Sequence, residues 1–178
     1  MDMRIEIAGR AVHCREVGEK IGVNLGAPRV GHWPIELGPW QVYVLNTGVP
    51  HAVLFVEDIL DIPFIDLAKE VRSHPAFAPE GVNVNFAQVT KEGALLVRTY
   101  ERGVEGETLS CGTGAAAAAW AAVQLYGLAH PLAVQTRRSM QSVSFEESLH
   151  FSFLGAPGAK EIEMIGPALL VFSGQIEI

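Results

Sequence analysis

The sequence predicts an α+β fold in which strands surround one small-sided helix. The strongest sign is the segment Thr113–Tyr126, which contains five consecutive alanines and is followed by Gly127, a common helix terminator. The second sign is a series of short apolar segments separated by Gly, Pro and Ser, which is typical of strands and turns. Because alanines place no bulk on a helix surface, we expect this helix to be buried, with strands packed closely around it.

The N-terminal part of the chain predicts strands, a linker and a short helix. Residues 31–39 carry Gly and Pro and have the composition of a linker. A helix is expected over Ile65–Arg72, because Ile65, Leu67, Ala68 and Val71 fall near one face. The expected strands are Arg4–Ile7, Ile21–Leu25, Gln41–Asn46 and Ala52–Val56.

The remaining elements are expected to be strands apart from the alanine-rich helix. Lys91-Glu92-Gly93 predicts a hairpin turn between the first two of them. Those beyond the helix are expected to run antiparallel, joined by Gly, Pro and Ser turns. The segments are Val82–Val89, Leu95–Tyr100, Val134–Arg138, Ser142–Phe145, Leu149–Phe153, Glu161–Ile165 and Ala168–Phe172.

Composition narrows the class of protein. The 178 residues are 49% hydrophobic and 19% charged, as in a globular domain with a real core. A formal charge of −7 and only 13 scattered basic residues argue against a nucleic-acid partner. Two cysteines and six dispersed histidines give neither a disulfide framework nor a metal-ligand spacing. With no signal-like start and no apolar run long enough to span a bilayer, we expect a cytoplasmic protein without a membrane partner.

One segment carries a recognisable chemistry. Cys111 stands on a glycine-flanked turn at the expected first turn of the alanine-rich helix, shortly after Glu101 and Arg102. A helix start offers free N–H groups and about half a positive charge, so it binds anions and favours the thiolate form of a cysteine. The turn therefore predicts an activated thiol beside a carboxylate-binding pocket. The alternative is a small buried cysteine without reactivity, which is our interpretation of Cys14.

Several segments together resemble the diaminopimelate epimerase family of cofactor-independent amino-acid epimerases. Glu101-Arg102-Gly103 followed by Gly106–Gly114 resembles the second cysteine motif of that family, and Asn46–His51 before an apolar run resembles its Asn-Pro-His strand motif. Glu80–Phe86 resembles its asparagine-bearing loop, and Gly166–Ala168 with Val171–Ile178 resembles its C-terminal strands. The resemblance is collinear over nearly the whole chain. It implies a curved mixed or antiparallel sheet wrapped around a central helix.

The resemblance also implies roles for individual residues. Cys111 would be a catalytic acid/base, and His51 would support the reacting thiols. Substrate-binding residues would be Asn83, Glu101, Arg102, Gly112 and Thr113, with no metal and no cofactor. Taken alone, His51 suits a structural role, Asn83 a turn or strand edge, and Glu101 with Arg102 a surface ion pair. Asn85 is a weaker candidate.

Three features depart from the family pattern. Val49 stands where many members carry a substrate-binding asparagine, and one extra residue near Glu105 makes the position of Glu107 uncertain, although a bulge could absorb it. The segment that supplies the first catalytic cysteine has no counterpart here. Cys14 lacks a glycine-rich loop and a following helix, and its surroundings resemble the last strands of the missing half.

These departures set the expected domains and activity. We interpret residues 1–32 as remnant strands of an N-terminal lobe, 33–168 as the C-terminal epimerase lobe, and 169–178 as a strand returning to the N-terminal lobe. The implied reaction is the interconversion of LL- and meso-2,6-diaminopimelate by two-cysteine proton transfer, in lysine and peptidoglycan biosynthesis. The alternatives are a non-catalytic binding or structural remnant of the fold, or a related racemase with a different substrate. Alone, the chain is expected to lack normal activity and either to self-associate or to need a separate first half.

Overall fold

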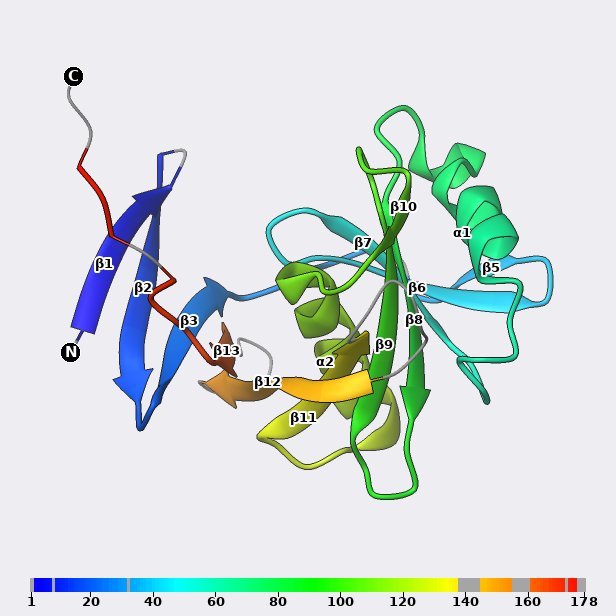
Figure 1. The fold of residues 1–178 in the computed structure, drawn as a ribbon. Helices are drawn as coiled ribbons and strands as arrows, with labels where there is room; N and C mark the ends of the chain where they lie inside the picture. Colours follow the sequence, from blue (N-terminus) through cyan, green and yellow to red (C-terminus); the bar gives the residue numbers. More distant parts are fainter. Residues whose placement is uncertain are drawn as a thin grey trace.

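Strands and two α-helices build the protein, as a computed structural model shows (Figure 1). The structure describes residues 2–7, 9–31, 33–137, 145–154, 161–171 and 173–175. Within these ranges, thirteen strands form one mixed sheet, with the main strand order β1-β2-β3-β13-β12-β11-β9-β8-β7-β6-β4. β10 pairs with β9, and β5 pairs with β6. The α+β class expected from the sequence is confirmed.

The element bounds follow in chain order. A 3₁₀ helix spans Pro75–Phe77. The helices are α1 (Phe64–Arg72) and α2 (Gly112–Tyr126), and the strands are β1 (Asp2–Ile7), β2 (Arg10–Val17), β3 (Lys20–Gly26), β4 (Arg29–Val30), β5 (Ile35–Leu37), β6 (Trp40–Asn46), β7 (Pro50–Phe55), β8 (Asn83–Val89), β9 (Leu95–Glu101), β10 (Gly106–Thr108), β11 (Leu132–Arg137), β12 (Phe145–Leu154) and β13 (Glu161–Gly166).

Helix α2 is the buried centre of the fold. It contacts β6, β7, β8, β9, β11, β12 and β13, and all five alanines of Ala115–Ala119 are fully buried. The helix ends at Gly127, whose φ of 63° lies in the left-handed region and whose N–H binds the Val123 carbonyl. The expected central small-sided helix with strands wrapped around it is therefore confirmed.

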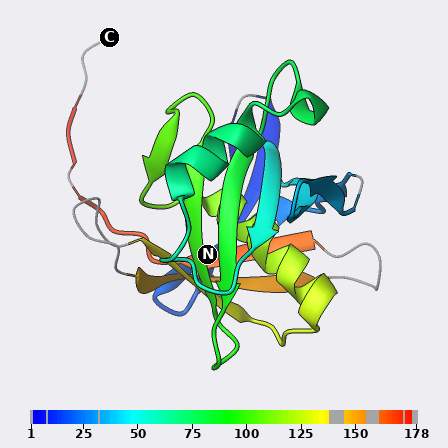
Figure 2. The same ribbon diagram turned by 90° about the vertical axis from the view of Figure 1, so that its right-hand side faces the viewer.

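The strands β8 and β9 separate two cores. Phe86 and Tyr100 belong to the core under α1, whereas Ala87 and Val97 belong to the core around α2. This alternation is what a strand buried on both faces requires. Figures 1 and 2 show α1 and α2 on opposite sides of these strands.

Helix α1 matches the prediction in its place but not in its inner face. Phe64, Leu67, Ala68 and Val71 are buried, while Ile65 is 42% exposed. With about 100° between successive residues, Phe64 lies on the same face as Leu67, Ala68 and Val71, whereas Ile65 falls to the side of that face. Phe64, which the expected range 65–72 left out, takes the inward position instead.

The N-terminal region contains more strand than the sequence predicted. Instead of two strands over residues 3–30, the structure has β1, β2 and β3 as an antiparallel meander, followed by β4. The strand over residues 10–17 was not predicted, because its charged and apolar residues do not alternate regularly. The predicted linker 31–39 also contains β5. β3 pairs with β13, which joins the meander to the rest of the sheet.

The C-terminal predictions are partly wrong. Residues 168–171 were expected to be a strand, but among the described residues they have no strand partner, and they lead away from the body (Figures 1 and 2). The apolar sequence there remains exposed, with Leu169, Leu170 and Val171 all above 85% exposure. Gly174 and Gln175 are not in a strand either. The rest of the expected 174–178 strand, Phe172 and most of 142–145 lie outside the described residues.

The sheet is mixed rather than antiparallel throughout. β7 runs parallel to β8, and β11 runs parallel to β9, whereas β8 and β9 are antiparallel. In this register His51 of β7 lies opposite Asn83 of β8, and Asn85 lies opposite Thr99 of β9. Three neighbouring strands thus place polar side chains near one another at the start of α2.

Candidate active site

Cys111 occupies the N-cap position of α2. Its backbone is extended, with φ −128° and ψ 105°, and its carbonyl accepts the first helical hydrogen bond from Ala115 N at 2.8 Å. The amides of Gly112, Thr113 and Gly114 therefore precede the helical ladder and point out of the helix end. The thiol is partly exposed. The sulfur therefore lies at the helix N-terminus where the sequence placed it, and its activation stays a prediction.

A chain of hydrogen bonds leads from this thiol into the core. The Cys111 Sγ lies 3.6 Å from the Thr113 Oγ1, which lies 3.0 Å from the His51 Nε2. The Nδ1 of His51 lies 3.1 Å from the Asn85 Nδ2. The Oδ1 of Asn85 accepts a hydrogen bond from the Thr99 hydroxyl at 3.0 Å. The structure thus connects Cys111, Thr113 and His51 and extends the network by two residues.

His51 is neutral in this environment. Its side chain is fully buried. Burial, together with the positive charge of Arg102, lowers the pKa of His51 to about 4. One ring nitrogen of the neutral imidazole therefore donates and the other accepts at physiological pH.

Asn83 links β8 to the turn that carries Arg102. Its Oδ1 accepts a hydrogen bond from Arg102 N at 2.8 Å, and its Nδ2 donates to the Pro50 carbonyl at 3.3 Å. The Arg102 guanidinium also donates to the Glu80 carbonyl at 3.4 Å. Glu101 ends β9 and lies opposite Gly106 of β10. These contacts hold the turn beside His51, and both side chains, Glu101 and Arg102, remain partly exposed.

The extra residue before Cys111 is accommodated by the turn at Glu105. Its φ is 55°, and its N–H binds the Glu101 carbonyl at 2.8 Å. The Glu105 carboxylate also pairs with Arg72 at 3.0 Å. The register between β9 and β10 shows no bulge, so the residues between these strands form a turn instead.

Glu107 serves a buried ion pair. Its carboxylate binds Arg98 through two hydrogen bonds of 2.7 and 3.0 Å and also pairs with Arg137. Arg98 in turn donates to the Ile59 carbonyl at 3.0 Å and lies 4.1 Å above the Phe64 ring. The Glu107 side chain is 7% exposed. These contacts engage both of its oxygens within the protein.

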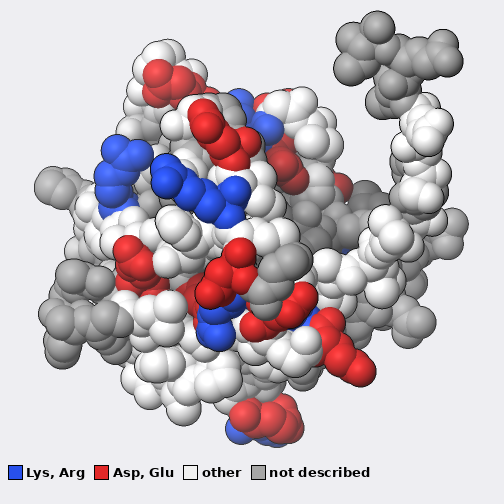
Figure 3. Space-filling model, turned by 90° about the vertical axis from the view of Figure 1, so that its left-hand side faces the viewer, with Lys and Arg blue, Asp and Glu red and all other residues white. Residues whose placement is uncertain are grey.

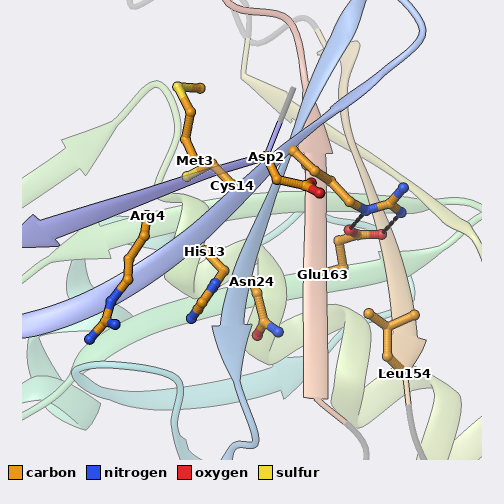
Figure 4. A pocket seen from close by; sticks show the side chains of 10 residues that line it. Asp2, Met3, Arg4, His13, Cys14, Asn24, Leu154 and Glu163 are labelled. Carbon is orange, nitrogen blue, oxygen red and sulfur yellow. Dashed lines mark hydrogen bonds and ion pairs between the residues drawn. The ribbon is translucent and has the colours of Figure 1, made fainter.

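A separate cavity of about 390 Å³ lies among the N-terminal strands and β13 (Figure 4). Cys14 of β2 is buried at its wall, opposite Met3 and Val23 of the neighbouring strands. The Arg15 guanidinium donates to both carboxylate oxygens of buried Glu163, at 2.5 and 2.7 Å. The assignment of Cys14 to structure rather than catalysis stays a prediction.

Other functional classes find little support in the described residues. No group of three or more His, Cys, Asp or Glu among them could hold a metal ion. Within the same ranges, no helix is both long and apolar enough to cross a membrane. On the face seen in Figure 3, acidic and basic side chains are interspersed rather than gathered into one basic patch.

Comparison with known proteins decides the family. The family model described as diaminopimelate epimerase matches residues 43–150, which include β7, β8, β9 and α2 with every candidate residue named above. The chain belongs to the diaminopimelate epimerase family. Members carrying this name are isomerases, and the expected resemblance is therefore confirmed.

Curated relatives support this family assignment over part of their length. Diaminopimelate epimerase from Methanocella arvoryzae is 41% identical over 140 residues, which are 78% of this chain and 45% of the relative. The enzyme of the same name from Archaeoglobus fulgidus is 39% identical over 155 residues, covering 80% and 54%. That from Chlamydia trachomatis serovar L2 is 49% identical over 96 residues, covering 54% and 35%. The chain thus spans about half or less of the relatives it matches.

Solved structures share the fold. A PhzF-family phenazine biosynthesis protein from Bacillus anthracis aligns with a TM-score of 0.71 at 13% identity, covering 99% of this chain and 69% of that one. A hydroxyproline epimerase from Agrobacterium vitis aligns with a TM-score of 0.64 at 18% identity, covering 94% and 57%. At these identities the likeness concerns the fold alone.

Part of the polar network is not indicated by the sequence motifs. Asn85 is the weaker candidate of the two asparagines, and Thr47 and Thr99 are not among the candidates, although both threonines are buried. Thr47 donates to the Thr113 carbonyl at 2.8 Å. One signal was available: Asn83 and Asn85 are two residues apart in a strand and therefore share one face. The cross-strand position of Thr99 depends on register, which the sequence did not fix.

Proposed function

We propose that this chain provides one side of a diaminopimelate epimerase active site, which interconverts LL- and meso-2,6-diaminopimelate. Cys111 is one of the two groups that exchange the α-proton. The observation that carries this proposal is the Cys111 thiol at the N-terminus of α2, 3.6 Å from a hydroxyl that is itself hydrogen-bonded to buried, neutral His51. The activity belongs to lysine and peptidoglycan biosynthesis.

The proton transfer needs two groups on opposite faces of the α-carbon. The thiolate of Cys111 takes the α-proton from one face and becomes a thiol, while the electron pair of the broken C–H bond stays on the α-carbon as a carbanion. A second acid on the opposite face delivers a proton to that pair, which inverts the centre. In the reverse direction the Cys111 thiol is the donor. Protons and electrons balance in this exchange without an oxidant or a cofactor.

The carbanion is stabilised by the groups that hold the α-carboxylate. In our proposal the amides of Gly112 and Thr113, at the N-terminus of α2, bind this carboxylate. Asn83 binds substrate at the neighbouring strand end. Glu101 pairs with the distal ammonium and Arg102 with the distal carboxylate, since a guanidinium fork matches a carboxylate. His51 acts on the Cys111 thiol through the Thr113 hydroxyl, which lies between them.

The second acid lies outside this arrangement. We propose that it belongs to a first lobe, with residues 1–32 as its remnant strands, 33–168 as the epimerase lobe, and 169–178 as the segment that returns to the first lobe. The chain alone, present as a cytoplasmic protein, then lacks one wall and one acid of the site. A separate partner carrying the first half would complete it, and without that half the chain would self-associate through its open strand edges.

A chimera tests the proposal. The part of the Methanocella arvoryzae relative that this chain does not match is joined to the start of the matched segment, and LL-diaminopimelate is supplied. We expect inversion to the meso form, followed by optical rotation, and its loss in Cys111→Ala. The isolated chain serves as the comparison and should show no inversion.

Two results would contradict the proposal. A folded chimera that leaves LL-diaminopimelate unchanged would remove the substrate assignment. Robust turnover by the isolated chain would remove the need for a second lobe. A circular dichroism spectrum and a cooperative melt establish that each protein tested is folded.

A further inference from the structure

The side-chain amide of Asn85 has only one orientation that satisfies its neighbours. Its Nδ2 lies 3.2 Å from the Ala52 carbonyl oxygen, which can only accept a hydrogen bond. Its Oδ1 lies 3.0 Å from the Thr99 hydroxyl, which can donate. The opposite orientation would place two acceptors face to face at Ala52. The nitrogen therefore points towards Ala52 and His51.

This orientation determines which nitrogen of His51 carries the proton. The Asn85 Nδ2 donates to the His51 Nδ1, so Nδ1 accepts and carries no proton. The ring is neutral, as its burial and lowered pKa of about 4 require. The single proton therefore sits on Nε2.

The same donor-to-acceptor direction of the hydrogen bonds continues from His51 to the Cys111 thiol. With its proton on Nε2, His51 donates to the Thr113 Oγ1 at 3.0 Å. The hydroxyl proton of Thr113 is then free to point to the Cys111 Sγ at 3.6 Å, within the hydrogen-bond range for sulfur. An O–H that donates to sulfur stabilises the thiolate more than the thiol.

The packing around Asn85 is built to keep this orientation. Asn85 and His51 are fully buried, and Thr99 is 3% exposed. Gly114 of α2 lies over the amide so closely that a Cβ there would be 2.2 Å from the Asn85 Oδ1. A glycine in the first turn of the helix thus makes room for the asparagine.

We propose that Asn85, braced by Thr99, is a positioning residue that holds His51 in its Nε2-protonated form and so directs the Thr113 hydroxyl towards the Cys111 sulfur. The role of Asn85 in catalysis rests on the proposed function. The His51 tautomer and the reactivity of the Cys111 thiol can both be measured without substrate. The proposal assigns the Thr113 hydroxyl, through His51, a role in preparing Cys111 to take the α-proton.

The first experiment reads the tautomer directly. In the uniformly ¹⁵N-labelled full chain, long-range ¹H–¹⁵N correlation distinguishes protonated from unprotonated ring nitrogens, and His51→Gln assigns the signals. We expect a neutral ring with the proton on Nε2 at neutral pH. Asn85→Leu, which cannot donate to Nδ1, should remove this preference. A wild-type ring protonated on Nδ1, or on both nitrogens, would overturn the proposal.

The second experiment measures the thiol. Iodoacetamide alkylation of Cys111 is followed by mass spectrometry of its peptide, at neutral pH and at alkaline pH, where every accessible thiol is ionised. We expect Asn85→Leu and Thr113→Val to slow the neutral-pH reaction about fivefold, the worth of one hydrogen bond to the thiolate, and to leave the alkaline rate unchanged. Thr113→Ser, which keeps the hydroxyl, should react like the wild type.

Thr47→Val is the matched control. Thr47 is buried like Thr99 and also binds near the thiol, but it donates to the Thr113 backbone carbonyl and lies outside the chain of donors. It should lower stability and leave the alkylation rate within twofold. Equal slowing by Thr47→Val and Thr113→Val would contradict the proposal. If Asn85→Leu does not fold, the proposal is tested by the tautomer of wild-type His51 and by the alkylation rates of Thr113→Val and Thr113→Ser. Neither measurement depends on epimerase activity.

Discussion

His51 connects the surface of the candidate site to the interior. The imidazole is fully buried, and its two nitrogens bind Thr113 on one side and Asn85 on the other. Burying an imidazolium there would cost more than burying the neutral ring. The same feature that orients the thiol therefore makes the folded state sensitive to acid.

The stability of the protein should fall below neutral pH because of His51. The unfolded chain takes up a proton on this residue below about pH 6.5, while the folded chain does so only near its pKa of about 4. Between these values the unfolded state binds more protons, so the free energy of unfolding decreases as the pH falls. We expect the wild type to lose about 3 kcal/mol more than His51→Gln over this range, measured by urea unfolding. Parallel pH profiles for the two proteins would contradict the account.

Gly114→Ala should be destabilising even though alanine is the better helix former. The propensity gain is about 1 kcal/mol, but the new Cβ would lie 2.2 Å from the Asn85 Oδ1. Gly112→Ala is the control, because its Cβ would meet only the flexible Met164 side chain, at 3.0 Å from the sulfur. We expect Gly114→Ala to lower the melting temperature clearly more than Gly112→Ala. The reverse order would show that the amide can move away.

For single residues, the sequence indicates which ones are candidates for the site better than it indicates which other residues they contact. Cys111, Thr113 and His51 were recognisable because each stands in a short motif. The roles of Asn85 and Thr99 depend on which residues face each other across β7, β8 and β9. Register is a property of the assembled sheet, so a single strand does not reveal it.

Among the elements, β9, β10 and β11 meet around one carboxylate. Arg98 comes from β9, Glu107 from β10 and Arg137 from β11, and all three side chains are less than 10% exposed. Glu107 therefore fastens the short strand β10, which leads to Cys111, to the body of the sheet.

Glu107→Gln should strongly destabilise the protein. The change removes the charge that the buried Arg98 guanidinium binds through two hydrogen bonds, and breaking a buried pair in this way costs about 3–5 kcal/mol. Glu105→Gln is the control, since the Glu105 side chain is 49% exposed and such pairs contribute about 1 kcal/mol at most. Chemical denaturation measures both. Equal losses for the two variants would show that burial of the Glu107 pair adds nothing.

Elements with clear periodicity or composition were predicted well, and those with mixed patterns were not. The alanines of α2 and the apolar runs of β6 and β7 indicated their structures directly. β2 was missed because His13, Arg15 and Glu16 interrupt its apolar residues. Residues 168–171 were predicted as a strand from their apolar character, but a strand also needs a partner edge, and these residues have none in the described structure.

The whole molecule presents unpaired surfaces. β1 lies at one end of the strand order and pairs only with β2 within the described residues. Beyond β13, Leu169, Leu170 and Val171 are almost fully exposed. Open strand edges and contiguous exposed apolar residues both favour association.

We expect the chain to self-associate in a concentration-dependent way. Replacing Leu169, Leu170 and Val171 with serine should shift the equilibrium towards the monomer, because it removes apolar surface that is almost fully exposed. Light scattering over a range of concentrations measures the mass. A single monomeric species at every concentration would contradict this expectation.

Cys111 is the group that takes and returns the α-proton in the proposed reaction, and one measurement tests this role directly. The chimera described above is incubated with LL- or meso-diaminopimelate in heavy water, and deuterium at the α-carbon is followed by mass together with optical rotation. We expect the protein with Cys111 to incorporate deuterium as it inverts the centre, and Cys111→Ala to invert neither isomer. Inversion that persists in a folded Cys111→Ala protein would contradict the central claim.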